Sequence, residues 1–216
     1  MNDMTDMMFA TELYDVQRER WPSTGKHILA HHDDDTVVVY QAYNPRIADA
    51  AVAEQKLGGG GFSFERMSWI KPNFLWMMFR SGWATKDNQE RVLALTLKRP
   101  AFDGLLRDAV ASSMGASTHA NKADWQRALK HSEVRLQWDP DHDPHGHKVQ
   151  RRAVQLGLRG DTLRTVVAGD ALVRVDDVTP FVVEQRALVG TPQLRTPVEH
   201  VYVPDDGDAA TNVGLD

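Results

Sequence analysis

The clearest pattern in the chain is a strand over Thr36–Tyr43, a run of β-branched and aromatic residues that follows an acidic turn at residues 33–35. Side chains of a strand alternate between its two faces, so we expect Val37, Val39, Gln41 and Tyr43 to share one face. The polar residues Gln41 and Tyr43 therefore stand at the end of a strand face that is otherwise apolar. Other apolar or alternating runs predict further strands at residues 91–98, 133–138, 151–158 and 171–176.

Helices are indicated by capping residues and by apolar positions three or four residues apart. Asn44 as N-cap and Pro45 as first helical residue predict a helix over residues 45–57, and the four glycines at 58–61 predict a flexible turn after it. Residues 72–82 are apolar on nearly all sides, which predicts a buried helix. Further helices are expected at residues 11–20, 100–112, 124–130, 161–168 and 180–189.

The order of these elements favours an α+β fold, because strands come singly and in pairs with helices irregularly between them. We expect a single domain with a mixed, mostly antiparallel sheet and helices packed on it. A length of 216 residues suits one domain. The expected parts are a polar N-terminal extension over residues 1–25, the globular domain over residues 26–203, and a disordered acidic tail over residues 204–216.

Composition and charge narrow the class of protein. The chain has no cysteine, which excludes disulfides, thiolate metal sites and cysteine nucleophiles. No apolar stretch approaches the ~20 residues of a membrane span, and acids stand near the N-terminus where a secretory signal carries cations. We therefore expect a cytoplasmic protein without a membrane partner. The net charge of −5 argues against broad capture of nucleic acid, but the balance between Arg66 and Arg107 is basic enough for a local anion site.

The most informative stretch for function is FSFERMSWIKPNFLWMMFRSGW at residues 62–83, where aromatic and Met side chains surround Arg66, Lys71 and Arg80. An isolated buried charge is costly, so these cations need partners or must line a cavity if the run folds inward. The alternative is that they snorkel over a buried helix. We interpret the run as a binding pocket, in which Arg and Lys hold an anion and Trp69 stacks on a ring.

Gln41 and Tyr43 belong to the same predicted pocket because they end a strand just before a helix N-terminus, where free backbone N–H groups favour a ligand site. Ser68, which lies between the cations of the aromatic run, is a further candidate. For Gln41 the alternative is that its amide satisfies buried backbone groups.

Three more candidates lie on the later strands. Glu90 precedes the strand at residues 91–98, where a carboxylate accepts a proton or holds a ribose hydroxyl; the alternative is a surface salt bridge. Arg152 and Gln155 are candidates for a second contact to an anionic substrate, with a structural role as the alternative.

The run WDPDHDPHGH at residues 138–147 contains three Asp and three His, which are ligands for hard or borderline metals. The glycine and the bidentate Glu of a calcium loop are missing at the required offsets. Two prolines and a glycine favour a rigid solvated turn, with metal binding as the alternative, so we do not expect a metal. Phosphate-loop, nucleophile-elbow, zincin and dinucleotide fingerprints do not occur in the chain.

The chain resembles the DUF4291 family over about residues 17–203. Five runs carry the resemblance: GKHILA at 25–30, VVVYQAYNPRIA at 37–48, RMSWIKPNFLWMMFRSGW at 66–83, VRLQWDPDHDP at 134–144 and RRAVQLGLRG at 151–160. The name of this family stands for an unknown activity, so the resemblance by itself implies no function.

A more remote resemblance is to ADP-ribosyltransferase-like folds. The strand end YQAY at residues 40–43, followed by Asn-Pro and an Ala-rich helix, resembles their first motif, with Gln41 in place of His or Arg. Ser68 before Trp69, and Glu90 at the start of a strand, resemble their later motifs, with a shorter gap between them. This likeness implies an NAD-using transferase in which Glu90 stabilises an oxocarbenium-like ribose, with Gln41 and Lys71 as the other catalytic residues.

Three functions follow as hypotheses. The first is an ADP-ribosyltransferase-like enzyme that modifies a nucleic acid, a nucleotide or a protein. Its NAD-binding residues would be Gln41, Tyr43, Arg66, Ser68, Trp69, Lys71 and Arg80. The second is a protein that binds or processes a nucleotide, another phosphate ligand or a nucleic acid without using NAD. The third is a non-catalytic interaction module, in which the aromatic run is simply core.

Overall fold

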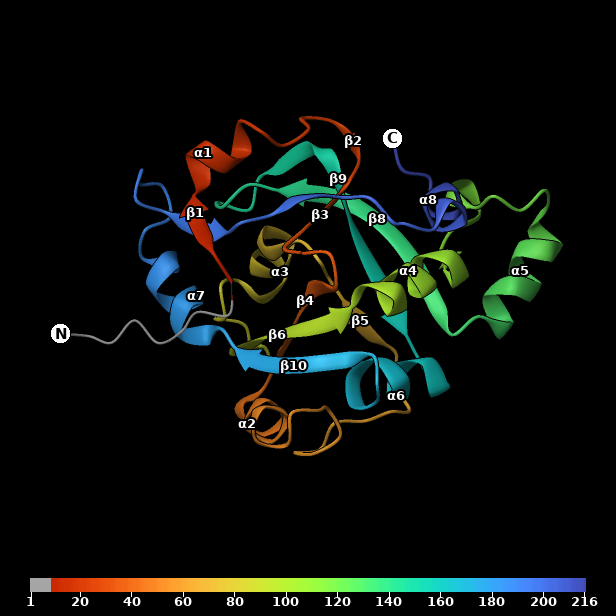
Figure 1. Cartoon of the computed structure of the whole chain (residues 1–216), viewed down its shortest axis with the longest axis horizontal. Helices are drawn as coiled ribbons and strands as arrows, with labels where there is room; N and C mark the ends of the chain where they lie inside the picture. The colour runs from red at the N-terminus through yellow and green to blue at the C-terminus, as the bar shows by residue number, and fades with distance from the viewer. Residues whose placement is uncertain (1–8) are drawn as a thin grey trace.

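An antiparallel sheet of three strands, in the order β10–β6–β4, lies at the centre of the molecule (Figure 1). The computed structural model describes residues 9–216. β4 (Thr36–Tyr43) and β6 (Arg91–Lys98) have the bounds that their sequence pattern predicts, and β10 (Leu172–Asp177) pairs with the other edge of β6. The register of β4 and β6 places Tyr43 opposite Arg91.

The described residues form eight α-helices: α1 (Tyr14–Arg18), α2 (Pro45–Glu54), α3 (Phe74–Ser81), α4 (Arg99–Asp108), α5 (Lys122–His131), α6 (Gly160–Ala168), α7 (Thr179–Arg186) and α8 (Gly207–Val213). The strands outside the central sheet are β1 (Thr11–Leu13), β2 (Gly25–Lys26), β3 (Ile28–Ala30), β5 (Ser68–Ile70), β7 (Val110–Ala111), β8 (Val134–His142), β9 (Lys148–Leu158), β11 (Arg195–Pro197) and β12 (His200–Tyr202). Every helix that the sequence predicts is present, with its ends shifted by a few residues.

Both faces of the central sheet are covered by helices, as the alternation along β4 predicts. Val37 and Val39 pack into one apolar cluster with side chains of α2, α4 and α6. Val38 and Tyr40, on the opposite face, pack into a second cluster with side chains of α3 and α7. The first five residues of α3 are all buried, which confirms the prediction of a buried helix there.

A second sheet is built around the long hairpin of β8 and β9, in the order β2–β9–β8–β7 with β5 also paired to β9. This sheet is mixed, because β2 and β7 run parallel to their neighbours while β5 and β8 are antiparallel to β9. α3 contacts both β4 and β8, and it lies between the two sheets (Figure 1). The architecture is therefore α+β with mostly antiparallel pairing, as predicted. Among the described residues, no helix combines the length and the apolar character that crossing a bilayer requires.

Residues 9–25 pack against the rest of the domain and are not a separate polar extension. Residues 1–8 of that predicted extension lie outside the described residues. Beyond them, β1 pairs with β11, and α1 covers only part of the helix predicted over residues 11–20. Gln17 is fully buried and donates from Nε2 to Thr196 Oγ1 at 2.8 Å, across 179 residues of sequence. Such a distant partner leaves no local signal in the sequence.

The C-terminal tail is helical where disorder was expected. Asp206 caps α8 by accepting a hydrogen bond from Asp208 N at 2.9 Å. Ala209 and Val213, four residues apart, are buried against the core, and Asn212 Nδ2 donates to Leu106 O of α4 at 2.9 Å. The acidic composition is that of a solvated tail, but two apolar residues on one side of a helix dock it onto α4.

Glu199, between β11 and β12, is a buried carboxyl group that connects the C-terminal segment to the start of α3. It is only 2% exposed, and its Oε1 accepts a hydrogen bond from Phe74 N at 2.6 Å. Asn73 Nδ2 donates to Oε2 at 3.1 Å. Burial raises the pKa of Glu199 to about 8, although these two donors favour the charged form. The native state therefore holds a proton here that the unfolded chain releases near pH 4.5.

This raised pKa predicts a pH-dependent loss of stability. Between pH 5 and pH 8 the folded protein binds more protons at Glu199 than the unfolded chain, so this residue lowers the free energy of unfolding as the pH rises. We expect Glu199→Gln to remove that slope, so that its stability relative to wild type improves steadily from pH 5 to pH 8. Urea unfolding at several pH values measures the difference. The exposed Glu184→Gln serves as control, and a constant difference across this range would contradict the prediction.

Candidate functional site

A cleft of about 900 Å³ opens where the end of β4, the segment before β5, the last turn of α3 and the β8–β9 hairpin meet. It brings together eight of the ten residues that the sequence singled out: Gln41, Tyr43, Arg66, Ser68, Trp69, Lys71, Arg80 and Gln155. Asn44, the N-cap of α2, also lines the cleft, so a polar strand end and a helix start meet there as expected.

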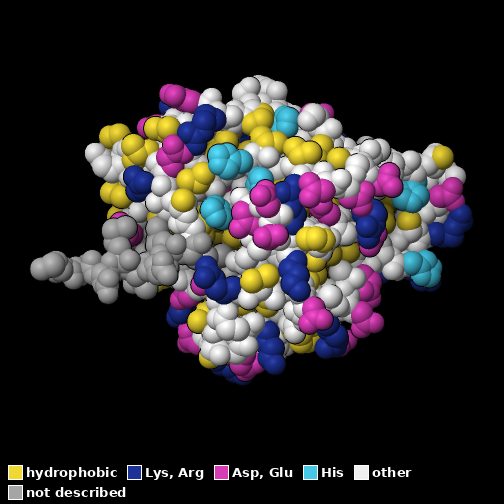
Figure 2. All heavy atoms as spheres, viewed as in Figure 1, with side chains coloured by type: hydrophobic (Ala, Val, Ile, Leu, Met, Phe, Trp, Pro, Cys, Tyr) yellow, Lys and Arg dark blue, Asp and Glu magenta, His cyan; other side chains and the backbone are white. Residues whose placement is uncertain are grey.

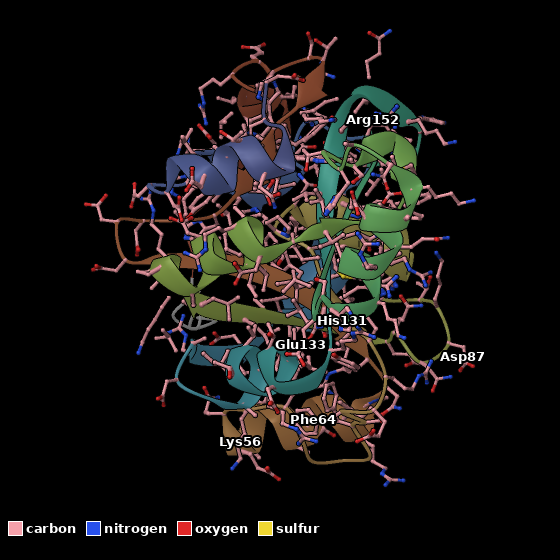
Figure 3. All side chains as sticks on the ribbon, turned by 90° about the vertical axis from the view of Figure 1, so that its right-hand side faces the viewer. Lys56, Phe64, Asp87, His131, Glu133 and Arg152 are labelled. Atoms are coloured by element: carbon pink, nitrogen blue, oxygen red, sulfur yellow. The ribbon has the colours of Figure 1, made fainter. Side chains whose placement is uncertain are left out.

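The other two predicted residues, Arg152 and Glu90, do not line the cleft. Arg152 is exposed on β9, and Figure 3 shows it at the opposite end of the molecule from Phe64, which packs on the cleft residue Phe62. Alternation along β9 turns Arg152 to the face away from Gln155, because the two are three residues apart. Glu90 directly follows Asn88 and Gln89, which do line the cleft.

Gln41, Tyr43 and Ser68 form a closed ring of hydrogen bonds in the cleft. Gln41 Nε2 donates to Ser68 Oγ at 2.7 Å, and the Tyr43 hydroxyl donates to Gln41 Oε1 at 2.8 Å. Because Tyr43 has a single hydroxyl proton, Ser68 is the donor in the 3.1 Å contact between the two hydroxyl groups. Both ends of the Gln41 amide are thus used within the protein, which makes Gln41 a residue that positions Tyr43 and Ser68.

Burial also controls the protonation of this ring. It raises the pKa of the Tyr43 hydroxyl, and a weaker opposing effect comes from the hydrogen bond with Ser68. Tyr43 therefore stays protonated at neutral pH and keeps its role as a donor to Gln41.

Lys71 is the buried cation of the site. It is only 5% exposed, and its backbone is fixed by paired hydrogen bonds with Tyr40, at 2.7 and 3.2 Å. Its Nζ donates to Trp69 O at 3.3 Å. Burial lowers the pKa of Lys71 to about 8; the charge of Arg80 adds to this effect and that of Asp139 opposes it. Lys71 is thus held charged at pH 7 at a cost in free energy.

The three cations of the aromatic run all line this one cleft. Arg66 and Arg80 are exposed at its walls, whereas Lys71 is buried. Among the described residues, no carboxylate lies within 4 Å of the nitrogen atoms of these three side chains. The described residues that line the cleft include no Asp or Glu either. The cleft is therefore positively charged in a protein whose net charge is −5.

Charges of both signs are mixed on one face of the molecule. On the face that Figure 2 shows, Asp and Glu side chains lie among Lys and Arg, without a continuous basic area. That face therefore shows no basic area of the kind that a nucleic-acid track needs.

Two polar residues that line the cleft were missed by the sequence analysis, Gln137 on β8 and Asn88 before β6. Gln137 stands directly opposite Gln155 in the ladder, and both line the cleft. Gln137 Nε2 donates to Asp139 Oδ1 at 2.8 Å, and Gln155 Nε2 donates to Asp139 Oδ2 at 2.7 Å. The sequence did contain a signal for Gln137, because apolar and polar side chains alternate within residues 133–138. Asn88 lies in the turn before β6, and that turn brings it to the cleft.

Two side chains of the Asp- and His-rich run, those of Asp141 and His142, pack against other residues of the protein. β8 continues to His142, so the expected turn is confined to residues 143–147. Asp141 is buried and accepts two hydrogen bonds from Arg151, at 2.9 and 2.6 Å. The ring of His142 stacks on that of Phe79, with centroids 3.5 Å apart. Within residues 9–216, no three His, Asp or Glu side chains are grouped to hold a metal ion.

The fold and the cleft together define an α+β protein with a cationic, amide-lined cleft. The chain belongs to the DUF4291 family, a domain of unknown function, whose family model matches residues 27–205. This range contains every predicted cleft residue, and it confirms the resemblance seen in the sequence. No curated protein matches the chain.

Proposed function

We propose that the protein binds a nucleotide or a closely related phosphorylated ligand in this cleft. The observation that carries the proposal is the set Arg66, Lys71 and Arg80, which lines one cavity in which the described residues include no acid. A buried ammonium group without a carboxylate at ion-pair distance is costly in the free protein, and an anionic ligand offsets that cost. Trp69 and Phe62 add aromatic surface for a ring.

The size of the cleft supports a small ligand. A volume of about 900 Å³ lies within the range of small-molecule sites, roughly 300–1,000 Å³. A non-catalytic module whose aromatic run is only core would have its cations paired with acids and no cavity beside them. The described residues have the opposite arrangement, which favours a ligand site.

A second candidate function is ADP-ribosyl transfer from NAD. Glu90 favours it, because its Oε1 accepts from Asn88 N at 2.9 Å while its Oε2 is buried without a hydrogen-bond partner among the described residues. In this reaction the bond between ribose C1′ and the nicotinamide nitrogen breaks with its electron pair leaving on nicotinamide. An acceptor nucleophile then bonds to C1′ and loses its proton. A carboxylate one residue beyond the cleft lining would stabilise the positive charge that develops on the ribose.

Isothermal titration with ATP, ADP, inorganic pyrophosphate and NAD tests the proposed binding. We expect at least one of these anions to bind wild type, and Arg66→Gln and Arg80→Gln to weaken that binding by roughly 3- to 10-fold. Arg152→Gln removes an exposed guanidinium outside the cleft and is expected to leave affinity unchanged. If none of the four anions binds, or if Arg152→Gln weakens binding as much as the cleft variants, the proposal is wrong.

The transferase candidate has its own readout. Nicotinamide release from NAD by wild type, lost in Glu90→Gln while NAD still binds, would support it. NAD binding without nicotinamide release would leave the protein as a nucleotide binder.

A further inference from the structure

The pair of glutamines on the cleft wall has a fixed orientation. Gln137 and Gln155 each point an amide nitrogen at the same carboxylate, that of Asp139, at 2.8 and 2.7 Å. A carboxylate accepts hydrogen bonds and donates none, so the group that faces it must be the NH2 of each amide. The Oε1 atoms therefore point away from Asp139, and this orientation follows from chemistry alone.

The two Oε1 atoms are acceptors that the protein leaves free. Both glutamines line the cleft, and they stand opposite each other across β8 and β9. Neither Oε1 accepts a hydrogen bond from another described residue, and neither is among the buried atoms left unpartnered. They are thus accessible acceptors, carried by facing residues of two neighbouring strands in the cleft wall. The cations that line the same cleft, Arg66, Lys71 and Arg80, are donors only.

We infer that this glutamine pair selects nucleotides whose base carries an exocyclic amino group, and that Asp139 is the residue that positions it. The inference rests on the proposed nucleotide site. An amino group offers two N–H donors, which match the two Oε1 acceptors. In a base with a carbonyl oxygen at the same place, that oxygen would be a third acceptor facing the two Oε1 atoms. None of these three oxygen atoms would then have a hydrogen bond from the others. Phosphate groups bind the cations whichever base is present, so affinity and selectivity come from different residues.

ATP and ITP are the matched probes, because they differ only at one edge of the base, where the amino group and acceptor N1 of adenine are replaced by a carbonyl oxygen and an N1–H. We expect wild type to bind ATP at least tenfold more tightly than ITP in isothermal titration. In Asp139→Asn the residue at 139 gains an NH2 group, so one glutamine turns its Oε1 toward it and its own NH2 into the cleft. The preference for ATP should then fall to within about threefold.

Three further variants separate selectivity from binding and from folding. Gln155→Met removes one acceptor without a change in charge and is also expected to reduce the preference. Lys71→Met should weaken the binding of ATP and of ITP by the same factor and leave the ratio of the two affinities unchanged. Asp170→Asn, an exposed Asp between α6 and β10, controls for the loss of a charge and should change neither affinity nor ratio. Circular dichroism confirms that each variant is folded.

The outcomes are distinct. Equal binding of ATP and ITP to wild type overturns this inference but leaves the proposed function standing. A preference that survives in both Asp139→Asn and Gln155→Met also overturns it, because selectivity would then come from other residues. If neither nucleotide binds wild type, the inference falls, and the proposed function falls too unless another phosphorylated ligand of the titration panel binds.

Discussion

Replacement of Gly60 by alanine is expected to destabilise the fold by about 3 kcal/mol or more. Gly60 has a φ of +61°, a left-handed conformation that costs a side chain about 1–2 kcal/mol. A Cβ built there would lie 2.1 Å from Arg46 O, in the first turn of α2. That turn is held by Asn44 Oδ1, which accepts from Ile47 N at 3.0 Å, so the backbone has little freedom to move away. Urea unfolding measures the effect.

Two other glycines provide graded controls for this prediction. Gly61 also has a positive φ, of +89°, but the nearest atom to a new Cβ is the flexible Arg46 side chain at 3.5 Å. Gly61→Ala should therefore cost only about 1–2 kcal/mol. Gly115→Ala meets no atom within 4 Å and should change stability by less than about 0.5 kcal/mol. Equal effects for Gly60→Ala and Gly61→Ala would show that the close approach to Arg46 does not matter.

Lys71→Met is expected to stabilise the free protein while it weakens ligand binding. The pKa of Lys71 is lowered from 10.5 to about 8, which corresponds to about 3 kcal/mol spent to keep the ammonium group buried at pH 7. Methionine has a similar shape and carries no charge, so most of this cost is recovered. The gain should be full below pH 8 and vanish above pH 10.5, where Lys71 is neutral in both states.

Binding should change in the opposite direction. Loss of one charge-assisted contact to phosphate predicts an affinity for the ligand that is roughly 10- to 100-fold lower. Lys56→Met is the matched control, because Lys56 is exposed beyond the end of α2 (Figure 3) and should affect neither quantity. If the Lys71→Met protein is less stable than wild type at pH 7, Lys71 has a structural partner within the protein. The argument that its charge binds an anionic ligand would then be wrong.

Local patterns predicted most of the elements, because buried and exposed positions repeat every two to four residues along a strand or a helix. The bounds of β4 follow from alternation, and the start of α2 follows from Asn44, whose side chain does cap Ile47. The four glycines at 58–61 were expected to form a flexible turn. Instead the turn has positive φ at three of them and packs closely on α2. Composition alone does not distinguish a flexible glycine turn from one that needs glycine for space.

The candidate site was predicted in part for the same reason. Residues 66–80 form one compact stretch of chain, so their cations could be assigned to one site from the sequence. Glu90 and Arg152 do not line the cleft, because their side-chain direction depends on the turn before β6 and on the face of β9. Gln137 and Asp139 were missed, because their importance arises only when β8 pairs with β9.

The sequence by itself determined that cations lie among large apolar side chains. Because removing a charge from water is costly, these cations need partners or a cavity. Only the tertiary structure decided between those outcomes. It placed Arg66, Lys71 and Arg80 around one cleft with no acid among its described lining residues. It also joined Gln137 and Gln155, 18 positions apart, to one carboxylate. The physical reason is that strand register and helix packing set such distances, and neither is written in the spacing of neighbouring residues.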